Sequence, residues 1–285
     1  MRAPSSHAVI GVILICIAAV SWSTAGLFTR IVTTDIPTIL FWRSLFGGLS
    51  VFIIYIIAHR PKALLPLFRF SLGEIVLACV SGIAMCLFIS AFFYTSIANV
   101  SFIYGTSPLE TVMLAWLLLK DKPAIVTTSA TFVSGCGVAI LAWGGQDFTD
   151  AIGLLLAGGM TVLMASLAVF VKYFPHTDAG KATYLSALIA MVAMVPFVES
   201  FAVNAHNFIW LAVYGFVNVG LGFGIYLIGV ARVSPATASL LGLLEVPLAP
   251  IWAAYFFNEA LTIAMIIGGV LITAAASIHI RATAS

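Results

Sequence analysis

Two stretches of the sequence combine an ionisable residue with proline inside a long apolar run. The first is Ser107-Pro108-Leu109-Glu110, and the second runs from Glu245 through Pro247 to Pro250. In a bilayer, proline leaves the carbonyl four residues earlier without its helical partner, and a carboxylate is costly unless it faces protein or water. The two stretches therefore predict discontinuous helices that line a cavity, each with free backbone acceptors beside a glutamate.

Composition defines the class of protein in which these stretches occur. The chain has 285 residues, of which 62% are hydrophobic and 8% charged, whereas about a quarter of residues are charged in a soluble domain. We therefore expect a polytopic protein whose partner is the lipid bilayer. The net charge of +2 gives no reason to expect a nucleic-acid partner. The four cysteines lie inside apolar runs, where packing is a better interpretation than a disulfide or a metal site: Cys16, Cys79, Cys86 and Cys136.

Ten apolar runs are long enough to cross the hydrocarbon core, which takes about 20 residues. They cover residues 9–32, 37–58, 72–97, 99–119, 124–144, 152–173, 180–200, 207–230, 234–257 and 262–280. The expected fold is all-α and integral to the membrane, with ten transmembrane helices.

The positions of Lys and Arg predict the orientation. Ten lie on the side of the N-terminus: Arg2, Arg60, Lys62, Arg69, Lys120, Lys122, Lys172, Lys181, Arg232 and Arg281. The other side has Arg30 alone, and Arg43 lies inside the second run. Because cytoplasmic loops carry the excess of basic residues, both termini are expected in the cytoplasm, with Asp35, Asp147, Asp150, Glu199 and Glu259 outside.

An internal repeat predicts the architecture. At an offset of 142 the first run matches the sixth, and at 133 the third matches the eighth, with these identities: Ile10/Ile152, Gly11/Gly153, Leu14/Leu156, Val20/Val162, Phe28/Phe170, Gly82/Gly215, Ala98/Ala231, Val100/Val233 and Ser101/Ser234. Five helices per repeat is an odd number, so the second half must enter the membrane inverted. We expect two inverted five-helix repeats, residues 1–145 and 146–285, around a central cavity, as in alternating-access carriers.

The chain resembles the EamA type of the drug/metabolite transporter superfamily over essentially its whole length. The resemblance rests on the Trp22 region, Phe41-Trp42-Arg43, Ser107-Pro108 followed by Trp116 to Asp121, and Pro247 followed by Tyr255 to Glu259. The chain departs from the family pattern at Asp121, where glutamate is commoner, and by the valine between Glu245 and Pro247. Among subgroups it is most similar to bacterial exporters of amino acids, including aromatic ones, which implies a place in the cytoplasmic (inner) membrane.

Candidate substrate-binding residues are polar, aromatic or methionine side chains on the predicted cavity helices: Trp22, Ser23, Trp42, Met85, Tyr94, Tyr104, Ser107, Glu110, Met164, Asn218, Tyr226 and Glu245. Tyr214, Asn218, Gly222 and Tyr226 recur every four residues and share one helix face. Plain helix packing is the competing interpretation for most of these side chains. A gating or structural role is expected for Arg43, Pro108, Pro247 and Gly222. For Arg43, binding of a carboxylate is the alternative.

No nucleotide-binding loop, metal motif or nucleophile motif occurs in the sequence, so no cofactor, metal or catalytic residue is expected. The function predicted is export of small amphipathic metabolites, amino acids first, by alternating access. Export of another metabolite or of a hydrophobic drug is the alternative, and an integral-membrane enzyme is a weaker one. A monomer is expected, and a dimer stays open.

Overall fold

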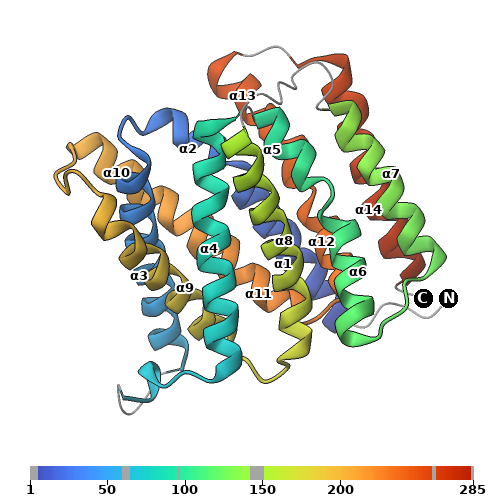
Figure 1. The fold of residues 1–285 in the computed structure, drawn as a ribbon, viewed down its shortest axis with the longest axis horizontal. Coiled ribbons are helices and arrows are strands. Elements are labelled where there is room, and N and C mark those ends of the chain that lie inside the picture. The colour runs from blue at the N-terminus through green and yellow to red at the C-terminus, as the bar shows by residue number, and fades with distance from the viewer. Residues whose placement is uncertain (1–5, 60–64, 96, 142–150, 259–260, 284–285) are drawn as a thin grey trace.

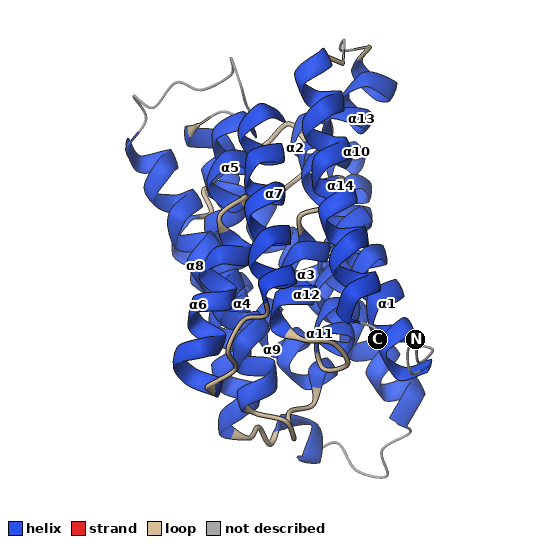
Figure 2. Cartoon of the chain, turned by 90° about the vertical axis from the view of Figure 1, so that its right-hand side faces the viewer, coloured by secondary structure: helices blue, strands red, loops and turns tan. Residues whose placement is uncertain are grey.

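A computed structural model describes residues 6–59, 65–95, 97–141, 151–258 and 261–283 of the chain. The regular structure in these ranges is helical, and they contain no strand (Figure 2). In chain order the elements are α1 (Ser6–Ser23), α2 (Ala25–Ile31), α3 (Ile36–His59), η1 (Leu65–Phe68), α4 (Leu72–Tyr94), α5 (Ile97–Tyr104), α6 (Ser107–Leu119), α7 (Ile125–Leu141), α8 (Ala151–Tyr173), α9 (Ala179–Met194), η2 (Val195–Phe197), α10 (Ala205–Tyr214), η3 (Gly215–Gly224), α11 (Ile225–Val230), α12 (Pro235–Gly242), α13 (Glu245–Phe257) and α14 (Ile263–Thr283). The element η3 is a π-helix, and η1 and η2 are 3₁₀-helices.

The number of helices that could cross a membrane is close to the ten that the sequence predicts. Within the described ranges, nine helical segments have the length and hydropathy needed to cross a bilayer, and a shorter apolar helix covers Ile125–Ile140. Each of the ten predicted runs coincides with one of these segments. The prediction of an all-helical integral membrane protein is confirmed to this extent.

Several of the apolar spans are interrupted along their length. The break between α5 and α6 falls at Gly105 and Thr106, so that Pro108 occupies the first turn of α6, where its missing N–H is not needed. The break between α12 and α13 falls at residues 243–244, directly before Glu245. Both proline stretches therefore produce the discontinuous helices that the sequence predicts. Pro250, by contrast, lies inside α13 and does not end it.

Polar residues immediately before the apolar runs set where several helices begin. Ser71 and Glu74 form a reciprocal capping box, in which Glu74 N donates to Ser71 Oγ (3.2 Å) and Ser71 N donates to Glu74 Oε2 (2.6 Å). Side-chain oxygens cap α3, α9, α10 and α12 in the same way, from Asp35, Asp178, Asn204 and Ser234. Each cap satisfies a backbone donor that the helix leaves free and is worth about 1 kcal/mol.

The spans stand side by side as a bundle (Figure 1). The pair α7 and α14 forms one edge, and α3, α9 and α10 form the other. Between the two edges lie α1, α4, α8, α11 and α12, and they surround the middle of the molecule.

Glycines bring the backbones of several spans into direct contact. A methyl group at Gly11 would lie 3.1 Å from the Gly229 carbonyl oxygen, and one at Gly229 would lie 3.1 Å from the Gly11 carbonyl oxygen. Similarly, a methyl at Gly215 would lie 2.5 Å from the Arg43 carbonyl oxygen. Because a larger residue would push these helices apart, glycine is required for the close packing of α1 with α11 and of α3 with η3.

The helices α7 and α14 pack on each other and contribute no residue to the central pocket described below. The glycine that makes their contact is Gly137, where a methyl group would lie 2.9 Å from the Gly268 carbonyl oxygen. At Gly135, by contrast, a methyl group would meet no atom within 4 Å. Gly135 therefore points away from the contact between α7 and α14.

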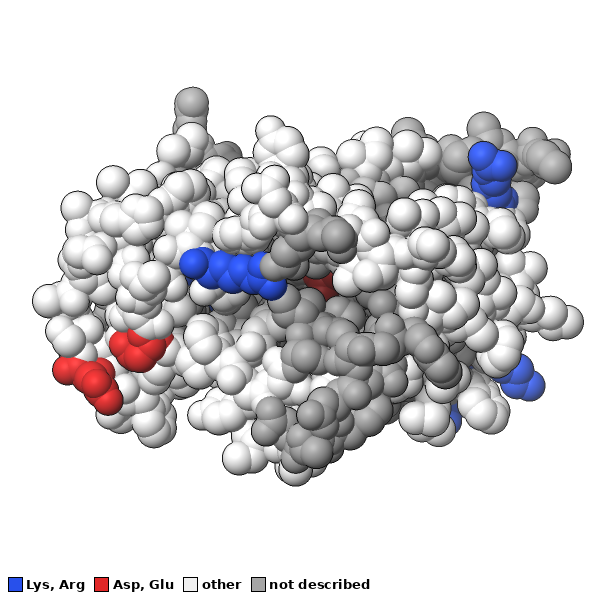
Figure 3. Space-filling model, turned by 90° about the horizontal axis from the view of Figure 1, so that it is seen from above, with Lys and Arg blue, Asp and Glu red and all other residues white. Residues whose placement is uncertain are grey.

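The start of α1 and the end of α14 lie at the same end of the bundle (Figures 1 and 2). Seen from the opposite end, one acidic side chain among the described residues lies deeper than its surroundings, near the middle of the face (Figure 3). Some residues used for the topology prediction lie outside the described ranges, namely Arg2, Arg60, Lys62, Asp147, Asp150 and Glu259, as does the predicted boundary between the repeats.

Candidate functional site: a central pocket with one carboxylate

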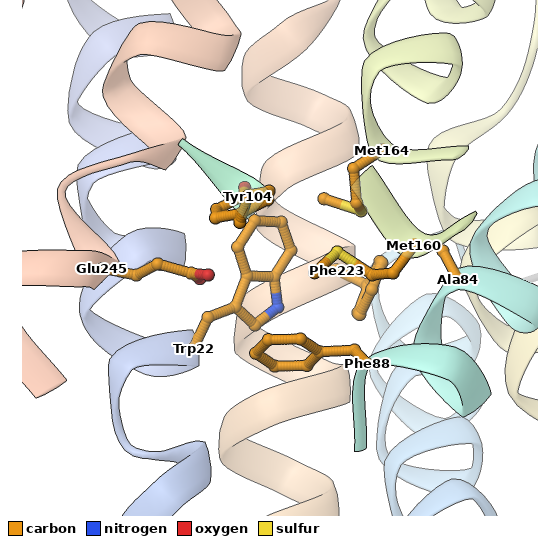
Figure 4. Close-up of a pocket in the computed structure, with 8 residues that line it drawn as sticks. All are labelled: Trp22, Ala84, Phe88, Tyr104, Met160, Met164, Phe223 and Glu245. Atoms are coloured by element: carbon orange, nitrogen blue, oxygen red, sulfur yellow. The ribbon is translucent and has the colours of Figure 1, made fainter. Parts of the chain in front are cut away.

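A small pocket, with a cavity volume of about 20 Å³, lies in the middle of the bundle (Figure 4). Residues from α1, α4, α5, α8, η3 and α13 line it: Trp22, Ala84, Phe88, Tyr104, Met160, Met164, Phe223 and Glu245. The lining is apolar apart from the Tyr104 hydroxyl, the Trp22 indole N–H and the Glu245 carboxylate. A pocket of this kind suits a ligand with an apolar body and one cationic group.

Glu245 is the charged member of this lining. It is the first residue of α13, directly after the helix break, and its side chain is 7% exposed. The carboxylate points into the pocket toward Trp22 (Figure 4), and no group of the described residues donates a hydrogen bond to it. The N-terminal end of α13 favours a negative charge at this position. A carboxylate so far from water and from protein donors needs a proton or a cation to balance it.

Trp22 forms the wall opposite the methionines. Its indole ring packs against Phe223 at 5.0 Å and against Tyr226 at 4.8 Å between ring centroids. The indole Nε1 donates a hydrogen bond to the backbone carbonyl of Asn218 at 3.2 Å. Gly222 makes room for the ring, because any side chain there would overlap the indole. The orientation of Trp22 is therefore set from η3.

Behind Trp22 lies a buried polar cluster around Asn218. The Asn218 side chain accepts a hydrogen bond from Arg43 Nη2 at 2.5 Å and donates one to the Ser21 carbonyl at 3.2 Å. The Arg43 guanidinium lies 4.9 Å from the centre of the Tyr214 ring. Both Arg43 and Asn218 are completely buried. One residue, Asn218, thus connects the indole of the pocket wall to a buried arginine.

The structure brings four of the predicted binding residues together in the pocket: Trp22, Tyr104, Met164 and Glu245. Tyr226 and Asn218 lie one contact behind it, through Trp22. The helix face that carries Tyr214, Asn218, Gly222 and Tyr226 is therefore turned toward α1 and α3, although part of this span is the π-helix η3.

Three more of the predicted binding residues are buried near the pocket without lining it. Ser23 accepts a hydrogen bond from Trp252 Nε1 at 2.8 Å, which joins α1 to α13. Ser107 and Ser239 are hydrogen-bonded at 3.1 Å between α6 and α12. Met85 is fully buried, with its sulfur 4.0 Å from the Ser44 hydroxyl. These contacts hold helices together.

The remaining three predicted residues lie away from the pocket. Trp42 belongs to an aromatic cluster with Phe46 and Phe208, at 5.6 and 5.5 Å. Tyr94 is 45% exposed at the end of α4. Glu110 accepts a hydrogen bond from the Thr106 hydroxyl at 2.8 Å, and its other oxygen is buried without a partner among the described residues. The expectation that both glutamates face the cavity is therefore corrected: Glu245 faces it, whereas Glu110 turns toward the start of its own helix.

Four pocket residues are not among the sequence candidates: Ala84, Phe88, Met160 and Phe223. Met160 could have been found, because it precedes Met164 by one helical turn and so shares its face. Alanine and phenylalanine carry no such signal in a chain where most residues are apolar. Among the described residues, no group of three or more His, Cys, Asp and Glu side chains is placed to hold a metal ion.

Comparisons with known proteins bear on the fold and the family of this chain. An uncharacterized transporter of Archaeoglobus fulgidus is 23% identical over 263 residues, which is 91% of this chain and 92% of that protein. A protein of known crystal structure has the same fold, with a TM-score of 0.80 at 19% identity, over 98% of this chain and 99% of that one. The EamA-like transporter family matches residues 9–143 and again residues 151–281. With nearly the whole chain covered by the two matches, this protein belongs to the EamA-like transporter family, and it is a multi-pass membrane transporter.

Proposed function

We propose that this protein exports small amphipathic metabolites, amino acids including aromatic ones first among them, across the cytoplasmic membrane by alternating access. The observation that carries the proposal is the Glu245 carboxylate, which stands without a protein donor in an aromatic and methionine-lined pocket at a helix break. Broken helices near mid-membrane are where secondary transporters bind their substrates.

The chemistry of the pocket supports a substrate with an amino group. An ammonium at Glu245 would supply the charge that the carboxylate lacks, and the face of Trp22 beside it would add a cation–π contact. The sulfurs of Met160 and Met164 and the ring of Phe223 offer an adaptable apolar surface to the side chain of the substrate. Aromatic and aliphatic amino acids both satisfy these requirements.

The size of the pocket does not decide between a small metabolite and a larger drug. Its cavity volume is about 20 Å³, far below the range of ligand pockets, which is about 300–1,000 Å³, so the pocket must widen to bind either of them. Export of another small amine stays the alternative, since it meets the same carboxylate.

The neighbours of each span support two inverted five-helix repeats, residues 1–145 and 146–285. The second span packs on the seventh (α3 with α9), and the fifth packs on the tenth (α7 with α14). The third packs on the sixth (α4 with α8), as the eighth packs on the first (α11 with α1). A methyl at Gly82 would meet the Ser186 carbonyl oxygen at 2.9 Å, just as one at Gly215 meets that of Arg43. An internal two-fold axis would exchange all of these contacts, and such an axis is the basis of rocking between two access states.

The test uses purified protein in liposomes loaded separately with phenylalanine, an organic cation and a sugar phosphate. Efflux of phenylalanine is the expected result, and Glu245→Gln should weaken it by about tenfold or more, because a charge-assisted contact to the ammonium is lost. The pH profile separates two roles of Glu245. Weaker binding of amino acids at all pH values indicates an ammonium ligand, and lost pH dependence with retained transport indicates a proton carrier.

Glu110→Gln is the matched control, since it removes the same charge from the first turn of the other broken helix. The glutamine amide keeps an acceptor for Thr106, so efflux should stay close to that of the parent. If Glu245→Gln transports like the parent over the whole pH range, the carboxylate does not belong to the site. If only the sugar phosphate leaves the liposomes, the substrates are sugar phosphates and not amino acids.

A further inference from the structure

Arg43 is a buried charge without a counter-charge. It lies at the eighth position of α3 and has no exposed surface. Of its donors, Nη2 reaches the Asn218 side chain, whereas Nε and Nη1 have no hydrogen-bond partner. No aspartate or glutamate of the described residues forms an ion pair with it. The hydroxyl of Tyr214, whose ring lies against the guanidinium, also lacks a partner.

This arrangement is incomplete in electrostatic terms. A guanidinium stays charged in proteins and has five N–H donors, so burial without an anion costs the full desolvation of the ion. The contact with the Tyr214 ring offsets only part of that cost. The neutral Asn218 amide accepts a hydrogen bond from one of these donors but does not compensate the positive charge of the guanidinium. A purely structural role would be served as well by an uncharged residue, whereas unused donors suit an anion that is bound for part of the cycle.

The position of Arg43 connects it to the central pocket. Asn218 accepts from Arg43 through its side chain and from the Trp22 indole through its backbone carbonyl. Trp22 lines the pocket, so the indole and the amide are the layer that separates the guanidinium from the substrate space. Asn218 also lies in the π-helical η3, a type of helix that occurs frequently at functional sites.

We propose that Arg43 is an anion-binding site, reached from the pocket when the Trp22–Asn218 pair moves aside. This inference rests on the proposed function: with the substrate ammonium at Glu245, the substrate carboxylate is the anionic group that Arg43 receives. A small inorganic anion such as chloride offers the same chemistry from a second source, and the experiment separates the two.

The first arm compares phenylalanine with 2-phenylethylamine, which lacks the carboxylate, in competition for efflux from proteoliposomes. The parent protein should prefer phenylalanine by about tenfold to a hundredfold. Arg43→Gln should abolish this ratio while the amine is still carried. Arg232→Gln is the control, because it removes an arginine whose guanidinium bonds the Ile228 carbonyl at the far end of α11, and it should leave the ratio unchanged.

The second arm replaces chloride by gluconate and follows the midpoint of thermal unfolding. If the anion is inorganic, chloride raises the midpoint of the parent and not that of Arg43→Gln, and the preference for phenylalanine survives in the variant. Either result supports an anion site and identifies its source. A ratio and a chloride response that are both the same in Arg43→Gln and in the parent overturn it.

Asn218→Asp keeps the test decisive if Arg43→Gln does not fold. It places a carboxylate where the amide already accepts from Arg43, so the protein supplies its own anion. The variant also loses the hydrogen bond to the Ser21 carbonyl, so its unfolding temperature is not part of the test, but it should lose the phenylalanine preference or the chloride response. If the parent shows the phenylalanine preference or the chloride response and Asn218→Asp keeps it, the proposal is refuted. A parent that carries neither phenylalanine nor the amine, yet responds to chloride, would refute the proposed function and leave the anion site standing.

Discussion

The two glycines of α7 predict opposite effects for the same substitution. Gly137→Ala places a methyl group 2.9 Å from the Gly268 carbonyl oxygen and 3.0 Å from both Leu271 and Ile272. Because two of these neighbours are backbone or Cβ atoms that cannot turn away, α7 and α14 must separate by a few tenths of an ångström. Strain of this kind costs about 1–3 kcal/mol. At Gly135 the methyl meets nothing within 4 Å, and alanine gains about 0.5–1 kcal/mol over glycine inside a helix.

The two variants should therefore differ by about 1.5–4 kcal/mol in unfolding free energy, which is roughly 3–16 °C in melting temperature for a chain of this size. Thermal unfolding of both purified proteins in the same detergent measures the difference. Phenylalanine efflux of the folded fraction should be unchanged in both, since neither helix lines the pocket. Equal melting temperatures would refute the packing argument, and an altered choice of substrate in Gly137→Ala would place α14 in the transport path.

Gly222→Ala should change the shape of the pocket and leave its polar groups in place, because the added methyl displaces the Trp22 indole and breaks its hydrogen bond to Asn218. The affinity of the purified protein for phenylalanine should fall by about tenfold or more. Unchanged affinity would contradict the assigned position of Trp22. Asp35 caps α3; partial burial raises its pKa, but hydrogen bonding with Thr38 and Thr34 outweighs this and the pKa is lowered. A group whose folded pKa lies below its unfolded pKa stabilises the fold above the unfolded value and loses this contribution as the pH falls through the folded one. Asp35→Asn keeps the cap, so its melting temperature should depend less on acid than that of the parent, and identical acid profiles would contradict the assignment. A reagent that cannot cross the membrane should label a cysteine at position 199 or 147 and not one at position 121, in a variant without native cysteines; the reverse pattern would invert the topology.

The sequence predicts the broken helices because their cause is local. Proline at 108 and 247 restricts the backbone wherever the helix lies, and the helices restart within two residues of both prolines. Which glutamate faces the cavity is a different question, since each residue along a helix turns the side chain by about 100°. Glu245 is the first residue of α13, and Glu110 is the fourth of α6. Their directions depend on where each helix begins, which spacing to proline does not determine.

For a similar reason, only some of the polar and aromatic candidates lie in the pocket. Trp22 and Tyr104 are in the pocket and Trp42 and Tyr94 are outside it, although all four are aromatic residues on predicted spans. The rotation of each helix about its axis decides the outcome, and that rotation comes from contacts between distant segments, such as the Trp22 indole with the Asn218 carbonyl. An apolar residue such as Phe223 cannot be recognised as pocket lining from the sequence, because the helices of this chain are apolar on every face.

The contacts at Gly11, Gly229 and Gly215 also bear on how the bundle can move. At these glycines the touching surface is partly main chain, from the carbonyl oxygens of Gly229, Gly11 and Arg43, and partly side chain, from atoms such as Val233 Cγ1 and Ile15 Cγ1. The α1–α11 and α3–η3 contacts are of this type, and the elements that they join carry Trp22, Phe223 and Arg43. Because the backbones touch at these joints, a displacement of α1 or α3 is transmitted directly to α11 or η3, so the elements that form the pocket wall move together.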